Sequence, residues 1–357
     1  MPPAAQRHAT RRLPWLVTAA ALASCGQPEP PAAELEPPEL LSGTGLFAAG
    51  SVTEIDPRNL PFVPQYPLWS DGASKRRWIR IPDGEAIDAR DPDAWQFPAG
   101  TRFWKEFSFG RRVETRYMER LADGSYRYAT YVWSEDGGDA RRAPAASSTQ
   151  VEIEGGSAHE VPSESDCRAC HEGRRSPVLG FGALQLSPDR DPNAPHRERV
   201  PEGGVDMAVL AARGVLTGLP ERLLREPPRI AGRGPRERAA LGYLFGNCSG
   251  CHNGEGPLAS LGLDFDHPVS ASEPPRALRS AVGQPSHFAI PGAEHTLRIA
   301  PGKPEASALA FRMASRFPAS RMPPLGTRLV DDEALELVRD WIENDLPEVP
   351  NTHGERL

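Results

Sequence analysis

The sequence has no run of eighteen apolar residues, so we expect no membrane-spanning helix in the mature protein. Positive charge is in deficit, because 41 lysines and arginines stand against 48 aspartates and glutamates, a formal net charge of −7. An acidic surface argues against nucleic acid as a partner and favours basic or neutral proteins. Cysteine and methionine are scarce, with five of each among 357 residues. The positions of these few sulfur-bearing side chains therefore carry much of the information.

The five cysteines leave none over for a disulfide. They comprise one at the end of an N-terminal apolar segment and two C-x-x-C pairs: Cys25, Cys167 with Cys170, and Cys248 with Cys251. The position of each cysteine therefore predicts its role.

Residues 1–25 have the composition of a bacterial secretory signal, in which a basic stretch, an apolar segment and small residues follow one another. The end of this segment, Leu-Ala-Ser-Cys, resembles a lipobox. We therefore expect Cys25 to be lipidated and to hold the protein on a membrane surface in the periplasm, although an ordinary cleaved signal is the alternative. Gly26 in place of an aspartate favours, by resemblance, the outer membrane. Residues 26–41, rich in proline and glutamate, are expected to form an extended tether.

Residues 42–158 are expected to form an antiparallel β-sandwich. Five runs are rich in aromatic and β-branched residues: 76–81, 101–109, 112–121, 126–134 and 150–154. Asp123-Gly124 between two of them predicts a hairpin. The region contains no histidine, no cysteine and a single methionine, Met118. It therefore offers no cysteine–histidine catalytic pair.

From residue 159 onward helical patterns replace the strand patterns, at 205–214, 235–245, 305–315 and 331–344. We therefore expect a multidomain α+β protein, in which the β-sandwich is followed by a mainly α-helical region. That region would comprise two units and a tail: 159–232, 233–346 and 347–357.

Both C-x-x-C pairs are followed directly by a histidine, His171 and His252. C-x-x-C-H is the attachment motif of haem c, because two thiols add to the two vinyl groups of one porphyrin edge and the adjacent histidine then ligates iron. The sequence therefore predicts two covalently bound haems in a mainly α-helical cytochrome c-like dihaem region. A zinc site also uses C-x-x-C, and a thioredoxin-like pair explains neither the histidines nor the duplication.

Met322, in Arg321-Met322-Pro323-Pro324, is predicted to be the second axial ligand of the haem on Cys248 and Cys251. Proline stiffens the loop that presents the sulfur, and a thioether ligand stabilises Fe(II) and raises the reduction potential. Met313 is the rival, although its helical setting favours a role in the core.

The first haem has weaker candidates for its second ligand. Met207 starts a helical pattern and is explained nearly as well by packing, His159 and His196 are alternatives, and the iron could also be five-coordinate. A carbonyl that accepts the Nδ1 proton of the proximal histidine fixes the orientation of its ring. Pro177 and Pro257, which follow the two motifs, are candidates for that carbonyl.

The chain resembles a family of exported dihaem c-type cytochromes from Gram-negative bacteria, mostly without an assigned reaction, over nearly all of residues 60–345. The resemblance implies an N-terminal β domain paired with two haem units and implies no substrate. In this family a glutamine is expected at position 207, which counts against Met207 as a ligand. Trp69, Asp71 and Lys75 are either a binding site or buried structural residues. The matching segments are Tyr66–Ala73 with Lys75, Phe97–Thr101 with Lys105 and Phe107, Thr130–Trp133, Val161–Ser163, Leu179-Gly180, Gln185-Leu186, Ile299–Gly302 and Arg321–Pro324.

We expect electron transfer between periplasmic or membrane redox proteins, so the protein is more a carrier than a catalyst. Two alternatives stay open. One is a peroxidase-like haem enzyme with an open first haem, for which no substrate is specified, and the other is a redox or docking subunit of a larger membrane-associated complex. Two low-spin haems would favour the carrier, and a high-spin component would favour chemistry at iron.

Overall fold

The computed structural model describes residues 1, 36–153, 156, 158–270 and 274–346. The chain divides into two units, Met1–Pro37 and Pro38–Leu357. The predicted signal with Cys25, most of the tether and the tail at 347–357 lie outside the described residues. None of the helices in the described ranges has the length and hydropathy that crossing a bilayer requires. The boundaries predicted within residues 42–346 stay predictions.

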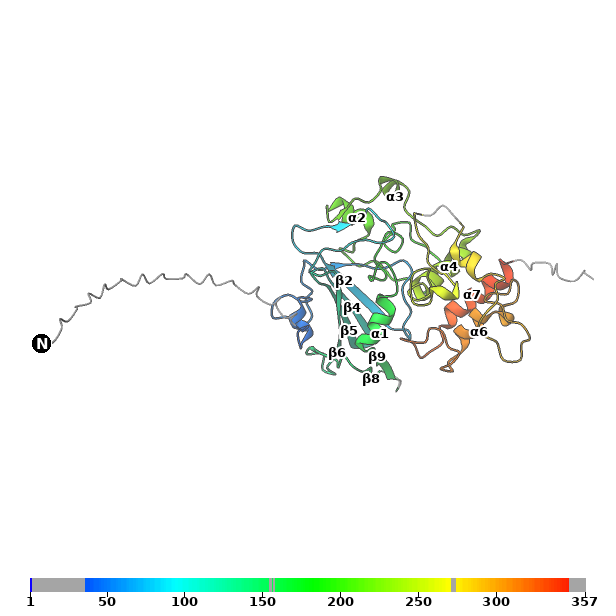
Figure 1. The fold of residues 1–357 in the computed structure, drawn as a ribbon, viewed down its shortest axis with the longest axis horizontal. Coiled ribbons are helices and arrows are strands. Elements are labelled where there is room, and N and C mark those ends of the chain that lie inside the picture. Colours follow the sequence, from blue (N-terminus) through cyan, green and yellow to red (C-terminus); the bar gives the residue numbers. More distant parts are fainter. Residues whose placement is uncertain (2–35, 154–155, 157, 271–273, 347–357) are drawn as a thin grey trace, which may run out of the picture. The chain divides into compact units, whose positions relative to one another are not determined.

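One six-stranded antiparallel sheet dominates the unit from Pro38 onward (Figure 1). Its strands, in spatial order, are β1 (Leu60–Pro61), β2 (Ser74–Arg80), β4 (Arg102–Phe109), β5 (Arg111–Arg120), β6 (Tyr126–Trp133) and β7 (Ala140–Arg142). Two small sheets pair β3 (Ile87–Asp88) with β10 (Leu216–Thr217) and β8 (Thr149–Glu152) with β9 (Ala158–Val161). The five predicted strand positions and the Asp123-Gly124 hairpin are confirmed.

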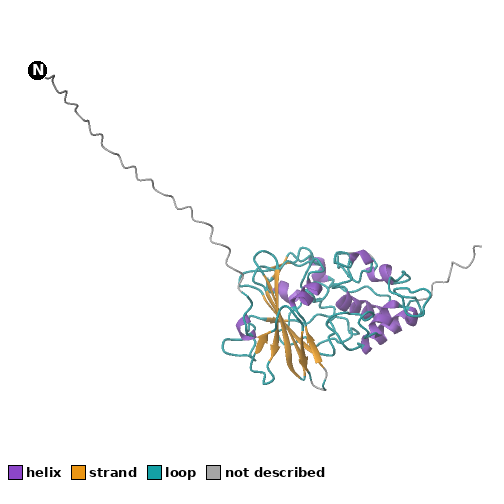
Figure 2. Ribbon diagram, turned by 60° about the horizontal axis from the view of Figure 1, so that its bottom comes forward, coloured by secondary structure: helices purple, strands orange, loops and turns teal. Residues whose placement is uncertain are grey.

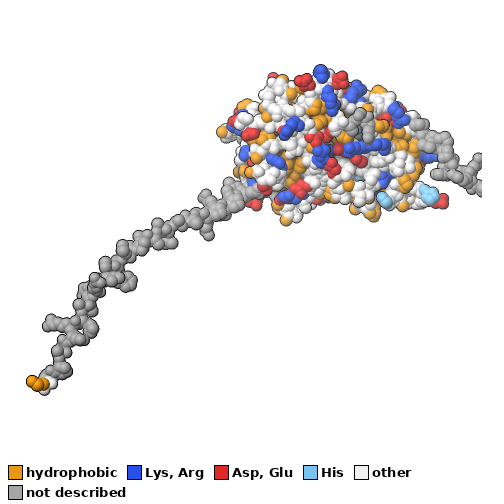
Figure 3. Space-filling model, turned by 45° about the horizontal axis from the view of Figure 1, so that its top comes forward, with side chains coloured by type: hydrophobic (Ala, Val, Ile, Leu, Met, Phe, Trp, Pro, Cys, Tyr) orange, Lys and Arg blue, Asp and Glu red, His pale blue; other side chains and the backbone are white. Residues whose placement is uncertain are grey.

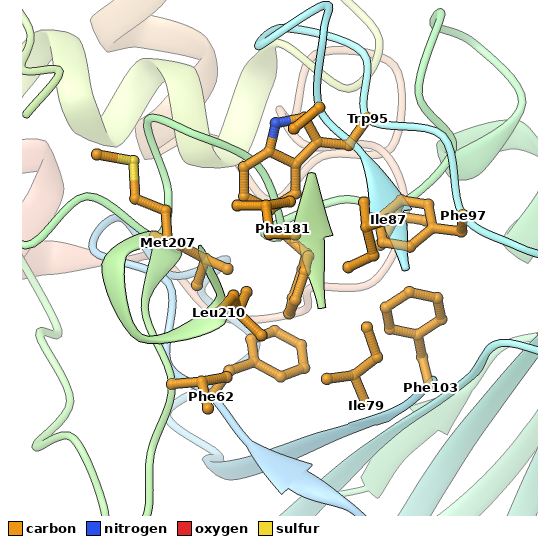
Figure 4. Close-up of a cluster of buried hydrophobic side chains, with 14 of the residues drawn as sticks. Phe62, Ile79, Ile87, Trp95, Phe97, Phe103, Phe181, Met207 and Leu210 are labelled. Carbon is orange, nitrogen blue, oxygen red and sulfur yellow. The ribbon is translucent and has the colours of Figure 1, made fainter. Parts of the chain in front are cut away.

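One face of the sheet carries two rows of side chains in register across its strands. Arg77, Lys105 and Arg116 are paired neighbours on β2, β4 and β5, and we call them the cationic row. The adjacent row is apolar and belongs to a buried cluster that also includes Trp95, Phe181 and Met207 (Figure 4). The members of this second row are Ile79, Phe103, Met118 and Tyr128.

The opposite face is covered by the N-terminal segment, which includes the 3₁₀ helix η1 (Leu41–Thr44). Leu41, Leu46 and Phe47 pack there against aromatic residues of the sheet. The indole nitrogen Nε1 of Trp104 donates to the Thr44 hydroxyl at 2.9 Å. The two faces of one sheet are thus buried by non-strand segments. The prediction of a β-sandwich is therefore wrong. The strands are buried on both faces, but the segments that cover them are not a second large sheet.

The prediction of a mainly α-helical region after residue 159 is also wrong, and the fold is β-rich. The described helices are α1 (Glu164–His171), α2 (Met207–Ala212), α3 (Glu221–Arg225), α4 (Pro235–Cys248), α5 (Arg276–Ala281), α6 (Ala308–Ala314) and α7 (Asp332–Asn344), with short 3₁₀ turns η2 (Ala259–Leu261) and η3 (Pro304–Ala306). They are joined by long irregular segments (Figure 2). The 39 prolines and 33 glycines of the chain interrupt longer helices. The four predicted helix positions are occupied. The helices α4 and α7, of 14 and 13 residues, have about the predicted length, whereas α2 and α6, of 6 and 7 residues, are shorter.

The C-terminal helices α4, α6 and α7 pack around a second buried cluster (Figure 1). Ala240 and Leu244 of α4 meet Val338 and Trp341 of α7 in this cluster, as the apolar spacing of both helices predicts. The Trp341 indole also donates to the Glu237 carboxylate at 3.1 Å. This packing fixes the end of α4, where Cys248 lies.

Candidate functional site

The first C-x-x-C-H motif lies on α1. Ser163 and Asp166 form a capping box, in which each side chain accepts a hydrogen bond from the backbone N–H of the other residue. The helix packs against β6. Cys167 and Cys170 are three residues apart on this helix, so their thiols share one face. The thiol of Cys167 is buried within hydrogen-bonding reach of the Thr130 hydroxyl, and burial raises its pKa to about 11.

His171 ends α1 with its ring held in one orientation. Its Nδ1 donates to the Pro177 carbonyl at 2.7 Å, which confirms the prediction for Pro177. Burial lowers the pKa of His171 to about 4, against the opposing effect of this hydrogen bond. The imidazole is therefore neutral near pH 7, with the lone pair on Nε2 available to a metal.

A large cavity lies beside this motif, with an empty volume of about 2170 Å³ that includes the solvent at its mouth. Cys167, Cys170 and His171 all lie on its wall. So do the indole of Trp95 and the phenol of Tyr128, whose buried N–H and O–H have no hydrogen-bond partner within the described residues. Buried donors without partners that face a cavity indicate that a ligand completes the site.

The second motif lies where α4 ends. The His252 backbone N–H donates to the Cys248 carbonyl at 2.9 Å, so the helical turn continues through the motif. Burial raises the pKa of the Cys248 thiol to about 12 and lowers the pKa of His252. The Nδ1 of His252 has no partner in the described part of the chain, so Pro257 does not take the role predicted for its carbonyl.

A second cavity, of about 1200 Å³ including its open side, is lined by Cys248, Cys251 and His252. Both Met322 and Met313 line it, so the structure brings the predicted ligand and its rival to the same site. Arg316 also lines it, and two of its guanidinium nitrogens, Nε and Nη1, are buried without partners among the described residues. Unpaired guanidinium nitrogens suit an anionic group such as a propionate.

The segment that carries Met322 is held at both ends by backbone hydrogen bonds. The Met322 N–H donates to the Arg312 carbonyl at 3.0 Å. Asp71 accepts hydrogen bonds from the backbone N–H groups of Arg328, at 2.8 Å, and Leu329, at 2.9 Å. Asp71 therefore anchors this segment to the sheet region. This is a structural role for one residue of the Tyr66–Ala73 segment, which carries part of the family resemblance.

The two motifs touch each other. The thiols of Cys170 and Cys251 are near enough to influence each other, and this interaction raises the pKa of Cys170 and lowers that of Cys251. The buried Asn253 amide donates to the Gly173 carbonyl at 3.1 Å and to the Ser249 carbonyl at 2.9 Å. A Cβ at Gly256 would overlap the Gly173 carbonyl oxygen, so this close approach requires glycine.

Other predicted residues lie apart from the first cavity. Met207 is fully buried in the apolar cluster of Figure 4 and is not among the residues that line the cavity. The Nε2 of His159 donates to Glu114 at 2.6 Å, and that of His196 to Asp331 at 2.7 Å. Cys25 lies outside the described residues.

Three side chains on the first cavity were missed by reasoning from the sequence as ligand candidates: Lys105, Met118 and His267. Lys105 carries a signal that was available, because it is one of only three lysines among 41 basic residues. Lysine, unlike arginine, can lose its proton when it is removed from water, so a rare lysine among arginines is a candidate ligand.

The residues present fit two covalently bound haems. Each cavity has two thiols and a neutral histidine on its wall, and unpaired polar groups beside them. Within the described ranges no group of three or more His, Cys, Asp or Glu side chains is arranged to hold a metal ion directly. Comparison of the chain with protein-family models, with curated proteins and with solved structures found no match.

Proposed function

We propose that the protein is a dihaem c-type cytochrome that transfers electrons between redox proteins. Cys167 with Cys170, and Cys248 with Cys251, would attach the two haems, and His171 and His252 would bind the irons. The observation that carries the proposal is the contact between the two motif segments, where Asn253 donates to the Gly173 carbonyl, together with the large cavity that each motif lines. Two attachment sites in contact suit a chain of cofactors that exchange electrons.

The two cavities also share part of their walls. Trp69, Asn247 and Cys251 line both of them. The Asn247 side chain accepts from the Trp69 backbone N–H at 2.8 Å, which fixes both residues between the cavities. A haem supplies one-electron chemistry when bound. The protein would hold the two haems close together, in two cavities that differ in polarity and in the side chains available as ligands.

Met322 would tune the second site. A thioether ligand favours Fe(II) and raises the reduction potential. The thioether therefore predicts a higher potential at the second site than at the first, so electrons would move from the first site to the second.

Exposed apolar side chains mark where a partner would dock. Phe317, Leu325 and Leu329 expose 69%, 42% and 52% of their surface, and Leu329 itself lines the second cavity. On the face drawn in Figure 3, basic and acidic side chains are interspersed rather than gathered by sign. An apolar patch at a cofactor mouth suits brief docking of a redox protein. We propose periplasmic or membrane redox proteins as these partners.

The proposed location follows from the sequence. Residues 1–25 would direct export, and lipidation at Cys25 would hold the protein on the outer membrane, with residues 26–41 as a tether. The haem-bearing region would then lie in the periplasm.

A potentiometric titration of the purified protein, followed by its visible spectrum, tests the proposed function. We expect two one-electron steps at separate potentials, from two low-spin haems. A high-spin ferric component in the wild type would favour a haem enzyme instead. The absence of any haem absorption would contradict the proposal.

A further inference from the structure

Lys105 is the exception within the cationic row. Arg77 forms an ion pair with Glu198 at 2.5 Å, and Arg116 pairs with Glu114. For Lys105 Nζ, no hydrogen bond or ion pair exists within the described residues, and its neighbour is the ring of Phe107 at 4.9 Å. The side chain of Lys105 is half-buried on the wall of the first cavity. Since an unpaired charge that is partly removed from water is costly, the amine lacks the partner that would stabilise it.

The unpaired amine belongs to the first cavity. Lys105 and His171 both line that cavity, together with Cys167 and Cys170. Thr130, which neighbours the Cys167 thiol, is paired with Arg116, and Arg116 is paired with Lys105. Lys105 is thus two strands from the attachment point, on the order of 10 Å at the usual strand spacing. A group attached at these cysteines and held by His171 would occupy the cavity that Lys105 also lines.

The chemistry of the row singles out this lysine. Arginine stays protonated in proteins and has no lone pair to offer, so Arg77 and Arg116 are excluded as ligands. Burial lowers the pKa of Lys105 well below its usual value, and the nearby charges of Arg77 and Lys75 lower it further. The neutral amine has a lone pair that an iron can accept.

We propose that the Lys105 amine is the second axial ligand of the iron bound by His171. This inference rests on the proposed function, because it presupposes a haem on Cys167 and Cys170. It places in the sheet a ligand that the sequence led us to seek at Met207. Two nitrogen ligands at the first iron, against nitrogen and sulfur at the second, also account for the order of potentials proposed above.

Two other side chains on the cavity wall are rivals. Met118 packs within the apolar row between Phe103 and Tyr128, where a core role explains it fully. His267 lies near Asp93 and Asp266, and their charges act against the lowering of its pKa by burial. Neither Met118 nor His267 lies in the cationic row, which connects Lys105 through Arg116 to Thr130 beside the Cys167 thiol.

The test that needs no variant uses isotope labelling. The chain has only three lysines, so growth on lysine labelled with ¹⁵N at Nζ marks three sites. We expect a ¹⁵N hyperfine coupling of directly bound nitrogen in pulsed electron paramagnetic resonance of one of the two low-spin ferric haems. A protein that carries two covalent haems but shows no such coupling would overturn the inference and leave the proposed function standing.

Substitution supplies the second arm, with haem content checked in every variant. In Lys105→Ala one of the two haems should become high spin and bind carbon monoxide when reduced. Lys75→Ala, which removes the other lysine of the same sheet face, should leave both haems low spin. If the spin change instead follows His267→Ala or Met118→Leu while Lys105→Ala keeps the wild-type spectrum, Lys105 is not the ligand. A wild type without covalent haem would refute the proposed function itself.

Discussion

Cys170 and Cys251, one from each C-x-x-C-H motif, lie near enough for each thiol to shift the pKa of the other, raising it for Cys170 and lowering it for Cys251. They are 81 positions apart in the sequence and come from α1 and from the turn after α4. Arg174, next to the first motif, strengthens the junction by donating to the Ser249 hydroxyl at 3.2 Å and to Asp266 at 2.8 Å. The fold therefore brings the two C-x-x-C-H motifs into contact, and the proposed electron transfer depends on that contact.

Gly256→Ala should push the motifs apart, because its Cβ would overlap the Gly173 carbonyl oxygen. We expect a loss of about 1–3 kcal/mol in the free energy of unfolding, as for other overpacked sites. Magnetic coupling between the two ferric haems, measured by electron paramagnetic resonance, should weaken. Gly254→Ala is the matched control, because its Cβ would meet Asp264 at an ordinary 3.5 Å. Equal behaviour of the two variants would refute the requirement for close approach.

Met322→Ala should remove the sulfur ligand of the second iron. The weak far-red absorption band typical of sulfur-bound ferric haem should disappear, and the potential of that haem should fall. Absorption spectroscopy and a redox titration measure both effects.

Met313→Ala is the control for this experiment, since Met313 lines the same cavity. It should keep the band and lose stability, by about 2–5 kcal/mol, through the cavity that it leaves in the core. A band that survives in Met322→Ala and vanishes in Met313→Ala would exchange the roles of the two residues.

Glu114→Gln should cost about 3–5 kcal/mol near neutral pH, because it removes the buried carboxylate that pairs with the guanidinium of Arg116, whose side chain is only 24% exposed. Burial alone would raise the pKa of Glu114, but the charge of Arg116 and the hydrogen bond from His159 outweigh it and lower the pKa. The carboxylate therefore stabilises the fold fully above the unfolded pKa of about 4.3, and this contribution is lost as pH falls through the lower folded pKa. Urea unfolding should show the difference from wild type shrinking below pH ~4, and a pH-independent difference would contradict this.

Leu329→Glu should slow electron transfer from the second haem to a protein acceptor. A charge within the exposed apolar patch opposes docking, whereas a small inorganic oxidant needs no docking surface. Stopped-flow oxidation by a small single-haem cytochrome c should slow several-fold, and oxidation by ferricyanide should not. Leu224→Glu, on the exposed side of α3, should leave both rates unchanged. If Leu329→Glu and Leu224→Glu react alike with the protein acceptor, docking occurs elsewhere.

The strands and helices could be located from local patterns, but their assembly could not. Alternation and turn residues fix where β4, β5 and β6 begin and end, because those signals are local. The same strands are compatible with a sandwich or with one sheet. The segments that cover the sheet, such as Leu41–Phe47, are irregular and carry no periodic signal, so a second sheet was expected in their place.

The two motifs could be recognised in the sequence because C-x-x-C-H has a fixed local spacing, which covalent attachment of a haem would require. The proximity of Cys170 and Cys251 could not be predicted from the sequence, because it depends on glycine and asparagine residues in loops, which give no periodic signal. Lys105 was missed for a related reason. Its significance comes from register, which places it beside Arg77 and Arg116 and over the first cavity, and register is a property of the folded sheet.

The central claim, two haems covalently attached to one chain, is tested most directly by the intact mass of the denatured protein. We expect the polypeptide plus two haems in the wild type, and plus one haem in the variant with both Cys248→Ser and Cys251→Ser. The variant with both Cys167→Ser and Cys170→Ser should likewise carry one. A wild-type mass that fits the bare polypeptide, or free thiols at all four of these cysteines, would contradict the account.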